Sequence, residues 1–283
     1  VVADDDLVKV HIHTEKPLDL IEYGASYGEI RTAKIENMRE QHRAIVETEA
    51  PRHEQQTAEP LPKEPKRYGI VAVAMGAGIA EIFRSLGADE VIEGGQTMNP
   101  STEDIVKALK KVPAEHYIIL PNNGNVVMAA QQAGQVINQP TSVVPSKTVP
   151  QGFAAMLAFN PDADPAENDE LMSEMVGQVK TGQVTYAVRD SQIDGFNIKE
   201  GDYLGIADGK ILASQSTLVE TAQQLLSEMV TSDTEIITVF YGQETDVDQV
   251  QQLAHFLSEQ FSDVEVEVHN GGQPLYYFLF AVE

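Results

Sequence analysis

The residues best suited to chemistry near the start of the sequence are His11 and His13, in the run LVKVHIHTEKP. Residues two apart on a strand point to the same face, so the two imidazoles could chelate one ion, and neutral imidazole is a good zinc ligand. A zinc site typically takes three or four protein ligands, and the nearby extras are Glu15 and His42. The pair is either part of a metal site or two ordinary, partly exposed strand residues.

Two polar loops form a second group of candidates, GGQTMNPST at 94–102 and LPNNGNV at 120–126. Each follows an expected strand and enters an expected helix. Ligands of open α/β sheets favour the carboxyl ends of strands, and free N–H groups at a helix start can hold a carboxylate or phosphate. Helix capping and turn formation explain the same residue types equally well. The candidates for ligand or partner binding are Thr97, Asn99, Ser101, Asn122, Asn123 and Asn125.

A third motif, MGAGIAEIF, follows an expected buried strand and provides Gly76 and Gly78 as G-x-G. The third glycine of a dinucleotide-binding turn is replaced by Glu81, which would place a carboxylate near a pyrophosphate. Close packing allowed by small residues is therefore the better interpretation. The sequence has no Walker loop, G-x-S-x-G or H-E-x-x-H motif, so it assigns no catalytic residue.

Composition divides the elements that position these residues into four parts. Residues 1–46 are too short for a confident core of their own; they contain a strand at 7–13, without an earlier partner in the chain, and a helix at about 17–27. Residues 47–67, ETEAPRHEQQTAEPLPKEPKR, form a proline-rich linker. The larger parts, 68–160 and 161–283, are both α/β.

The two larger parts differ in pattern. In 68–160, strands alternate with helices, for example GIVAVAM and then IAEIFRSLG, which predicts a parallel sheet. In 161–283, a half-exposed strand, QVTYAVRD, precedes two strands joined at ADGK, a strong hairpin signal. This part is expected to be a mixed α/β lobe with antiparallel strands.

Charge and composition exclude several classes of protein. The net charge is −25, and residues 161–283 hold 23 acidic and 4 basic residues. Such a surface repels nucleic acids and anionic membranes; it either serves solubility or provides a docking surface for a basic partner. No apolar run approaches the roughly 20 residues of a membrane span. No signal peptide is visible, and the absence of cysteine fits a cytoplasmic protein.

In combination, the motifs KVHIHT, NMREQH, GGQTMNPST and LPNNGN resemble the bacterial fatty acid kinase FakA family, once described as dihydroxyacetone-kinase-like proteins. The resemblance covers essentially all 283 residues. It implies a C-terminal piece of an ATP-dependent enzyme that phosphorylates a fatty acid, giving an acyl phosphate for phospholipid synthesis. ATP and Mg²⁺ would bind only to an N-terminal kinase domain that this chain lacks, so the chain alone is expected to be inactive.

The resemblance also implies a fold, a metal and partners. The part from 68 onward would be a two-lobed domain similar to DegV-type and FakB-type fatty-acid-binding proteins, and 1–46 the tail of a middle domain. His11 and His13 would be half of a zinc site completed by a cysteine upstream. The loop reads NGN at 123–125, where a Ser-Gly-Thr-like loop is usual. This departure favours a module that docks the fatty-acid-binding protein or forms a homodimer over a lobe that binds a fatty acid or another anion itself.

Overall fold

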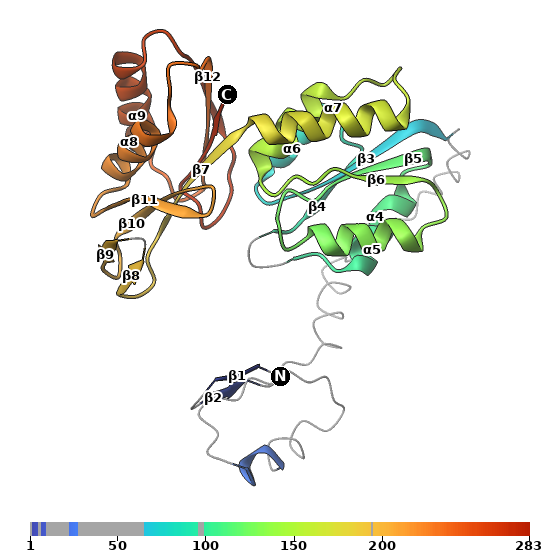
Figure 1. Ribbon diagram of the computed structural model, residues 1–283, viewed down its shortest axis with the longest axis horizontal. Helices are drawn as coiled ribbons and strands as arrows, with labels where there is room; N and C mark the ends of the chain where they lie inside the picture. Colours follow the sequence, from blue (N-terminus) through green and yellow to red (C-terminus); the bar gives the residue numbers. More distant parts are fainter. Residues whose placement is uncertain (1, 5–6, 10–22, 28–64, 96–98, 194) are drawn as a thin grey trace, which may run out of the picture. The chain divides into compact units, whose positions relative to one another are not determined.

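The computed structural model describes residues 2–4, 7–9, 23–27, 65–95, 99–193 and 195–283 (Figure 1). The chain divides into two compact units, 1–61 and 62–283, which are described separately. Three of the expectations lie outside the described residues: the pair His11 and His13, the candidate Thr97, and residues 47–64 of the linker.

In the first unit, strand β1 (Val2–Asp4) pairs antiparallel with β2 (Leu7–Lys9), and Val2 lies opposite Lys9. The expectation that the strand at 7–13 lacks an earlier partner was therefore wrong, because a pair of three-residue strands carries too little pattern to be recognised. A short helical turn begins at Tyr23, inside the helix predicted at about 17–27.

The second unit begins with an N-lobe, which we define as residues 66–178. Its four strands are all parallel, as predicted, in the order β4-β3-β5-β6. The central strand β3 starts at Lys66, so the predicted linker ends two residues earlier than expected. The strands are β3 (Lys66–Ala74), β4 (Glu90–Glu93), β5 (Ala114–Leu120) and β6 (Thr141–Val143).

Helices cover both faces of this sheet because alternate residues of β3 are apolar on each side. Ile70 and Ala72 pack with one group of helices, and Val71 and Val73 pack with the other. The first group is α3 (Ala77–Ser85), α6 (Val149–Ala158) and α7 (Pro165–Gln178), and the second is α4 (Thr102–Lys111) and α5 (Val127–Val136) (Figure 1).

The C-lobe, residues 180–283, is a mixed sheet of six strands in the order β11-β10-β7-β14-β12-β13. Strands β12 and β13 are parallel, and the other neighbours are antiparallel. These strands are β7 (Lys180–Tyr186), β10 (Tyr203–Ala207), β11 (Lys210–Gln215), β12 (Ile236–Tyr241), β13 (Glu265–Asn270) and β14 (Phe278–Val282).

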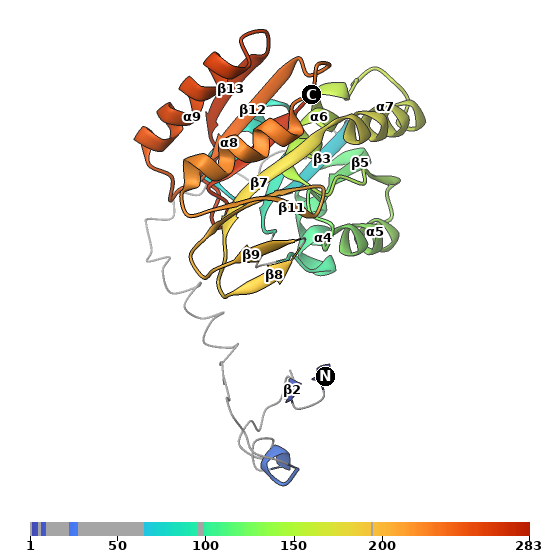
Figure 2. The same ribbon diagram turned by 60° about the vertical axis from the view of Figure 1, so that its left-hand side comes forward.

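Helices α8 (Leu218–Met229) and α9 (Val247–Gln260) cover one face of the six-stranded sheet (Figure 2). The predicted hairpin turn is present: Asp208 and Gly209 both have positive φ, which suits a two-residue turn between β10 and β11. A separate short hairpin, β8 (Ser191–Ile193) with β9 (Phe196–Ile198), follows β7 and was not predicted.

The boundary between the lobes lies later than the predicted residue 161, because α7 belongs to the N-lobe. Met172 and Val176 of α7 pack in the same core as β3. The acidic loop before α7 looks like a boundary in the sequence, but it is held to the start of β3. Arg67 donates to the Asp162 carbonyl at 2.9 Å and pairs with Asp164 at 2.8 Å.

The two lobes share a core through the uncovered face of the C-lobe sheet. Phe240 of β12 and Leu279 of β14 pack into the N-lobe core. The ring centroids of Phe83 and Phe153 are 4.3 Å apart, and those of Phe153 and Phe240 are 5.1 Å apart. This aromatic stack joins α3 and α6 to the C-lobe.

Candidate ligand cleft between the lobes

A cleft of about 100 Å³ lies where the N-lobe strands end and face the C-lobe. The loops after β3, β4, β5 and β6 form one wall, and β7, β14 and the loop at 273–276 form the other. Its polar lining is Asn122, Asn123, Lys147, Thr148, Thr181, Gln183, Gln273 and Tyr276. This is the place at which open α/β sheets usually bind ligands.

Asn122 lines the cleft, but its side-chain amide already has partners on both atoms. Its Nδ2 donates to the Val73 carbonyl at 3.0 Å, and its Oδ1 accepts from the Ser146 hydroxyl at 2.8 Å. The residue is buried with φ +52°, and a Cβ on Gly152 would lie 2.1 Å from Oδ1. Asn122 therefore ties β3, the loop after β6 and α6 together.

The other predicted residues divide between the cleft and the surface. Asn123 lines the cleft, and its Oδ1 accepts from the Asn125 backbone N–H at 2.8 Å, which shapes the turn before α5. Ser101 caps α4 and forms a capping box with Asp104. Hydrogen bonds from the Ser101 hydroxyl and backbone lower the pKa of the Asp104 carboxyl. Asn99 and Asn125 are exposed and lie outside the described cleft lining.

The G-x-G turn packs against the C-lobe backbone. A Cβ on Gly76 would lie 2.4 Å from the Gly271 carbonyl oxygen, and one on Gly78 would lie 1.8 Å from that of Asn270. The Ile79 N–H, in the first turn of α3, donates to the Gly271 carbonyl at 3.1 Å. The small residues do allow close packing, and the C-lobe loop occupies the space that a pyrophosphate would need at this helix start.

Gln273 is one of several residues of the cleft that the sequence did not indicate. Its side chain is 3% exposed, and its Nε2 donates to the Phe240 carbonyl at 3.0 Å and the Tyr276 carbonyl at 3.3 Å. Its Oε1 is buried without a hydrogen-bond partner among the described residues. An unpaired buried acceptor costs about 1–3 kcal/mol. A glutamine in a loop after a strand gives no sequence signal for such burial.

The cleft is too small for a long acyl chain. A volume of about 100 Å³ is well below that of pockets for drug-sized ligands, which measure roughly 300–1,000 Å³. The cleft is also bridged, because the hydroxyls of Thr148 and Thr181 lie 2.9 Å apart across the two lobes. Lys147 is the one basic side chain among the described residues that line it.

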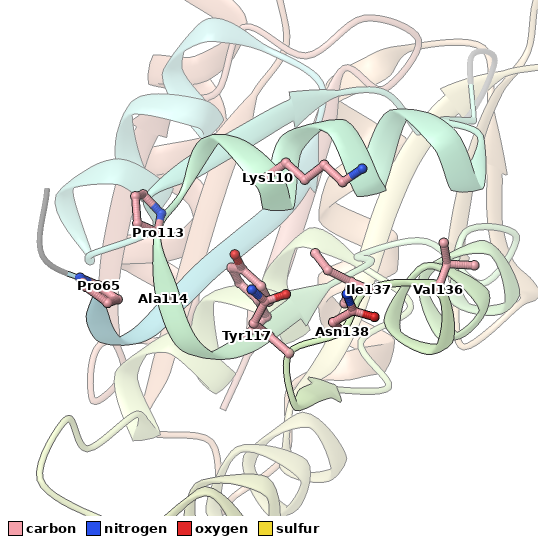
Figure 3. Close-up of a pocket in the computed structure, with 9 residues that line it drawn as sticks. Pro65, Lys110, Pro113, Ala114, Tyr117, Val136, Ile137 and Asn138 are labelled. Carbon is pink, nitrogen blue, oxygen red and sulfur yellow. The ribbon is translucent and has the colours of Figure 1, made fainter. Parts of the chain in front are cut away.

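A larger hollow of about 540 Å³ lies at the opposite end of the parallel sheet (Figure 3). Pro65, Pro113, Tyr117 and Ile137 line it, and Lys110 lies along one side. Burial raises the pKa of Tyr117, whose hydroxyl donates to the Val112 carbonyl at 2.8 Å. Among the residues of this lining, no nucleophile lies beside a base.

His116 and Ser142 form the described pair that most resembles a nucleophile and its base. His116 Nε2 and the Ser142 hydroxyl lie 2.7 Å apart. Burial lowers the pKa of His116, an effect that the charge of Asp169 partly offsets. Ser142 is only 7% exposed, so a substrate has no access to its hydroxyl. The pair links β5 to β6 and is structural.

The described residues offer neither a metal-binding cluster nor a membrane span. Among them, no group of three or more His, Asp or Glu side chains lies close enough to hold a metal ion. No helix in this part of the chain has both the length and the hydropathy that crossing a membrane requires.

The fold has relatives among solved structures. A fatty-acid-binding DegV family protein from Thermus thermophilus matches with a TM-score of 0.53 at 14% identity, over 77% of this chain and 99% of that chain. A Streptococcus pneumoniae Fatty Acid Kinase (Fak) B3 protein, loaded with linoleic acid, matches with a TM-score of 0.52 at 12% identity, over 76% and 99%. The two-lobed, DegV-like α/β fold predicted from the sequence is thus confirmed.

The sequence itself has closer relatives. Protein YloV of Bacillus subtilis is 51% identical over all 283 residues, and an uncharacterized protein of Staphylococcus aureus (strain USA300) is 46% identical over the same span. The chain covers 50% of each of these relatives. Residues 69–283 match the C-terminal domain of the FakA-like fatty acid kinase family, and residues 1–45 match the middle domain of the same family. This chain therefore belongs to the FakA-like family of fatty acid kinase subunits.

Proposed function

We propose that this chain is the non-catalytic part of a fatty acid kinase subunit that docks a fatty-acid-binding protein of the DegV or FakB type. A kinase domain elsewhere in the whole protein then phosphorylates the fatty acid that the partner presents, using ATP and Mg²⁺. The product is an acyl phosphate for phospholipid synthesis in the cytoplasm. Family membership supports the kinase assignment.

One observation favours docking over lipid binding by the chain itself. The fold resembles that of a fatty-acid-binding DegV family protein and of a Fak B3 protein loaded with linoleic acid, yet the cleft between its lobes measures about 100 Å³. Ile79 and Leu279, which line the cleft, belong to the same packed core as the aromatic stack of Phe83, Phe153 and Phe240. A DegV-like fold whose cleft is too small for a fatty acid is suited to binding another protein.

Activity of the whole kinase tests this proposal. We expect the full-length protein to form acyl phosphate from ATP, fatty acid and the binding protein, and a version without residues 68–283 to lose most of this rate. The isolated chain should bind the purified fatty-acid-binding protein in calorimetry. Folded chain that shows no binding at about 50 μM would contradict docking.

The alternative function, binding of a fatty acid or another anion by this domain, has its own measurement. Native mass spectrometry of the purified chain and thermal shift with added fatty acids should show no bound lipid. A retained lipid would favour the alternative, because the cleft would then have to open further than 100 Å³.

We also propose that the whole protein forms a homodimer and binds zinc through His11 and His13. Two imidazoles in a His-x-His pattern have the donor chemistry that zinc prefers, and a cysteine upstream would complete the site. Sedimentation should give twice the protomer mass. Zinc content of the full-length protein should fall when His11→Ala and His13→Ala are combined, and unchanged zinc would contradict the assignment.

A further inference from the structure

The loop between β13 and β14, residues 271–276, closes one side of the cleft, and we call it the cleft loop. Gln273 and Tyr276 of this loop line the cleft. The loop also contacts the opposite lobe, because the Ile79 N–H in the first turn of α3 donates to the Gly271 carbonyl at 3.1 Å. The position of the loop therefore helps to determine how wide the cleft is.

Leu275 has a strained backbone within this loop. Its φ is +69°, a left-handed value that is unfavourable for a bulky side chain. The Tyr276 N–H donates to the Pro274 carbonyl at 2.8 Å, so Leu275 is the central residue of a γ-turn, and the form with positive φ is rare and strained. The side chain is half-buried and is not part of the core described for either lobe, so core packing does not offset the strain.

Hydrogen bonds from the C-lobe hold the turn in this conformation. The Thr185 hydroxyl of β7 donates to the Leu275 carbonyl at 3.0 Å, and the Gln243 N–H donates to the Gln273 carbonyl at 3.1 Å. Backbone strain persists where the surrounding structure fixes it, and it is typical of ligand clamps and switch regions. The strain is thus balanced by contacts that a movement of the loop would break.

The buried amide of Gln273 is a second unfavourable feature of the same loop. Its Oε1 has no hydrogen-bond partner among the described residues, and the side chain is only 3% exposed. A buried acceptor regains a hydrogen bond when it reaches water. Outward movement of the cleft loop would therefore relieve both features, the backbone of Leu275 and the oxygen of Gln273.

A pair of glycines gives the loop a place to bend. Gly271 and Gly272 begin it, and Gly272 has φ +60°; glycine accepts positive and negative φ about equally well. Tyr276, which packs against the N-lobe core, marks the other end of the part that can move. Among the backbone hydrogen bonds of the described residues, the one from Ile79 is the single bond that joins the loop to the N-lobe. Opening therefore breaks few contacts between the lobes.

We propose that the cleft loop is a latch with two states, of which the closed state holds the cleft at about 100 Å³. In the open state, Leu275 relaxes to a negative φ, the Gln273 oxygen meets water and the cleft widens, while both lobes stay folded. The inference goes beyond the proposed function, because docking of a partner protein does not require the loop to move.

Hydrogen exchange of the whole chain measures the opening. The Ile79 amide has its acceptor on the cleft loop, whereas Phe280 lies fully buried in the interior strand β14. Local opening should let the Ile79 amide exchange about 100-fold faster than the Phe280 amide. The Ile79 rate should also be insensitive to low concentrations of urea, since opening of a loop exposes little surface.

Three substitutions of Leu275 vary the strain at one position. Asparagine tolerates positive φ, so Leu275→Asn should slow Ile79 exchange about fivefold relative to Leu275→Ala. Valine is β-branched and disfavours positive φ, so Leu275→Val should accelerate this exchange about threefold relative to Leu275→Ala. Leu275→Ala is the matched control, because it removes the contacts of the side chain and keeps the strain of the backbone.

A reporter thiol gives an independent measurement. The sequence contains no cysteine, so Thr181→Cys places a single thiol in the cleft, at a position that is 6% exposed. Labelling by N-ethylmaleimide should follow the same order, with Leu275→Val fastest and Leu275→Asn slowest. A single thiol on the exposed side of α8, Ser227→Cys, should label at one rate in all three backgrounds.

Circular dichroism verifies that each variant folds. Equal exchange of Ile79 and Phe280, with the same dependence on urea, would show that the loop opens only when the domain unfolds, and it overturns the inference. Ile79 exchange that does not depend on the residue at 275 overturns it as well, whatever the thiol shows. Binding of the partner protein is measured separately, so the proposed function stands or falls without this result.

Discussion

The two lobes differ in the number of their acidic and basic residues and in how these residues pair. The N-lobe, residues 66–178, holds 13 acidic and 7 basic residues, and the C-lobe, residues 180–283, holds 17 and 4. In the N-lobe, salt bridges such as Lys66–Asp89 and Lys111–Glu90 join neighbouring elements. In the described C-lobe, the ion pairs involve only histidine partners of Glu259 and Glu267.

This difference indicates which carboxylates hold the fold and which are available to a partner. Asp89 also accepts a hydrogen bond from the Ile70 N–H, so it helps to position the central strand. Glu244 and Asp248 are exposed and have no cationic partner among the described residues. Structural stability does not explain a surface of unpaired like charge, which either serves solubility or provides a docking surface for a basic partner.

Phe153→Ala tests whether the two lobes unfold together. Of the predictions made here, it has the largest expected effect. Removal of the ring at the centre of the aromatic stack should lower the free energy of unfolding by about 3–5 kcal/mol. Hydrogen exchange should then accelerate in both β5 and β12. Leu225→Ala, inside the C-lobe core, is the matched substitution. It should also accelerate hydrogen exchange in both β5 and β12. Protection lost only in the substituted lobe would show two independent units.

Gly78→Ala tests the contact between the α3 turn and the C-lobe loop. The added Cβ would meet the Asn270 carbonyl oxygen at 1.8 Å, so we expect about 2 kcal/mol of destabilisation in urea unfolding. Gly177→Ala is the control, since its Cβ would have nothing within 4 Å and it lies in α7. That variant should be stabilised by about 0.5–1 kcal/mol. Equal effects of the two substitutions would contradict close packing at the turn.

Ser101→Ala removes the cap of α4 and should cost about 1 kcal/mol. The folded pKa of Asp104 is lower than its unfolded value of about 3.9, so its stabilisation is present above that value and is lost as pH falls through the folded pKa. The difference in stability between wild type and Ser101→Ala should therefore narrow below about pH 4. A difference that stays constant from pH 7 to pH 3 would contradict this role.

Added salt should have the smallest effect on stability. It tests the repulsion between like charges on the C-lobe. Screening of like charges on the C-lobe should stabilise the chain by about 0.5 kcal/mol between 0.02 and 0.5 M salt. Thermal melting in sodium chloride measures it. A decrease in stability would show that N-lobe salt bridges outweigh C-lobe repulsion.

Most of the fold could be predicted because its signals are local. Ser101 as N-cap, Gly87 after α3 with φ +108°, and the turn at Asp208 and Gly209 all do what their residue types indicate. Prediction from the sequence was wrong where contacts between residues far apart in the chain determine the structure. The Arg67 contacts that hold the loop before α7 join residues more than ninety positions apart, and no periodicity reports such a contact.

The candidate site was predictable in place but not in detail. Polar residues after parallel strands predicted a binding region, and two of the six candidates, Asn122 and Asn123, line the cleft. The sequence could not show that the amide of Asn122 is already hydrogen-bonded, nor that Gln273 enters from the other lobe. The first fact depends on how β3 and the loop after β6 pack within the N-lobe, and the second depends on how the two lobes pack; no single segment encodes either.

The place of β3 in its sheet has a mechanical consequence. The chain that precedes this domain joins it at Pro65, and the next residue begins β3, an interior strand with parallel partners β4 and β5 on its two sides. Tension applied through that junction pulls along the strand, so the ladders on both sides resist it in shear rather than opening one bond at a time. The junction therefore meets the domain at a strand whose two hydrogen-bonded ladders share any load that reaches it.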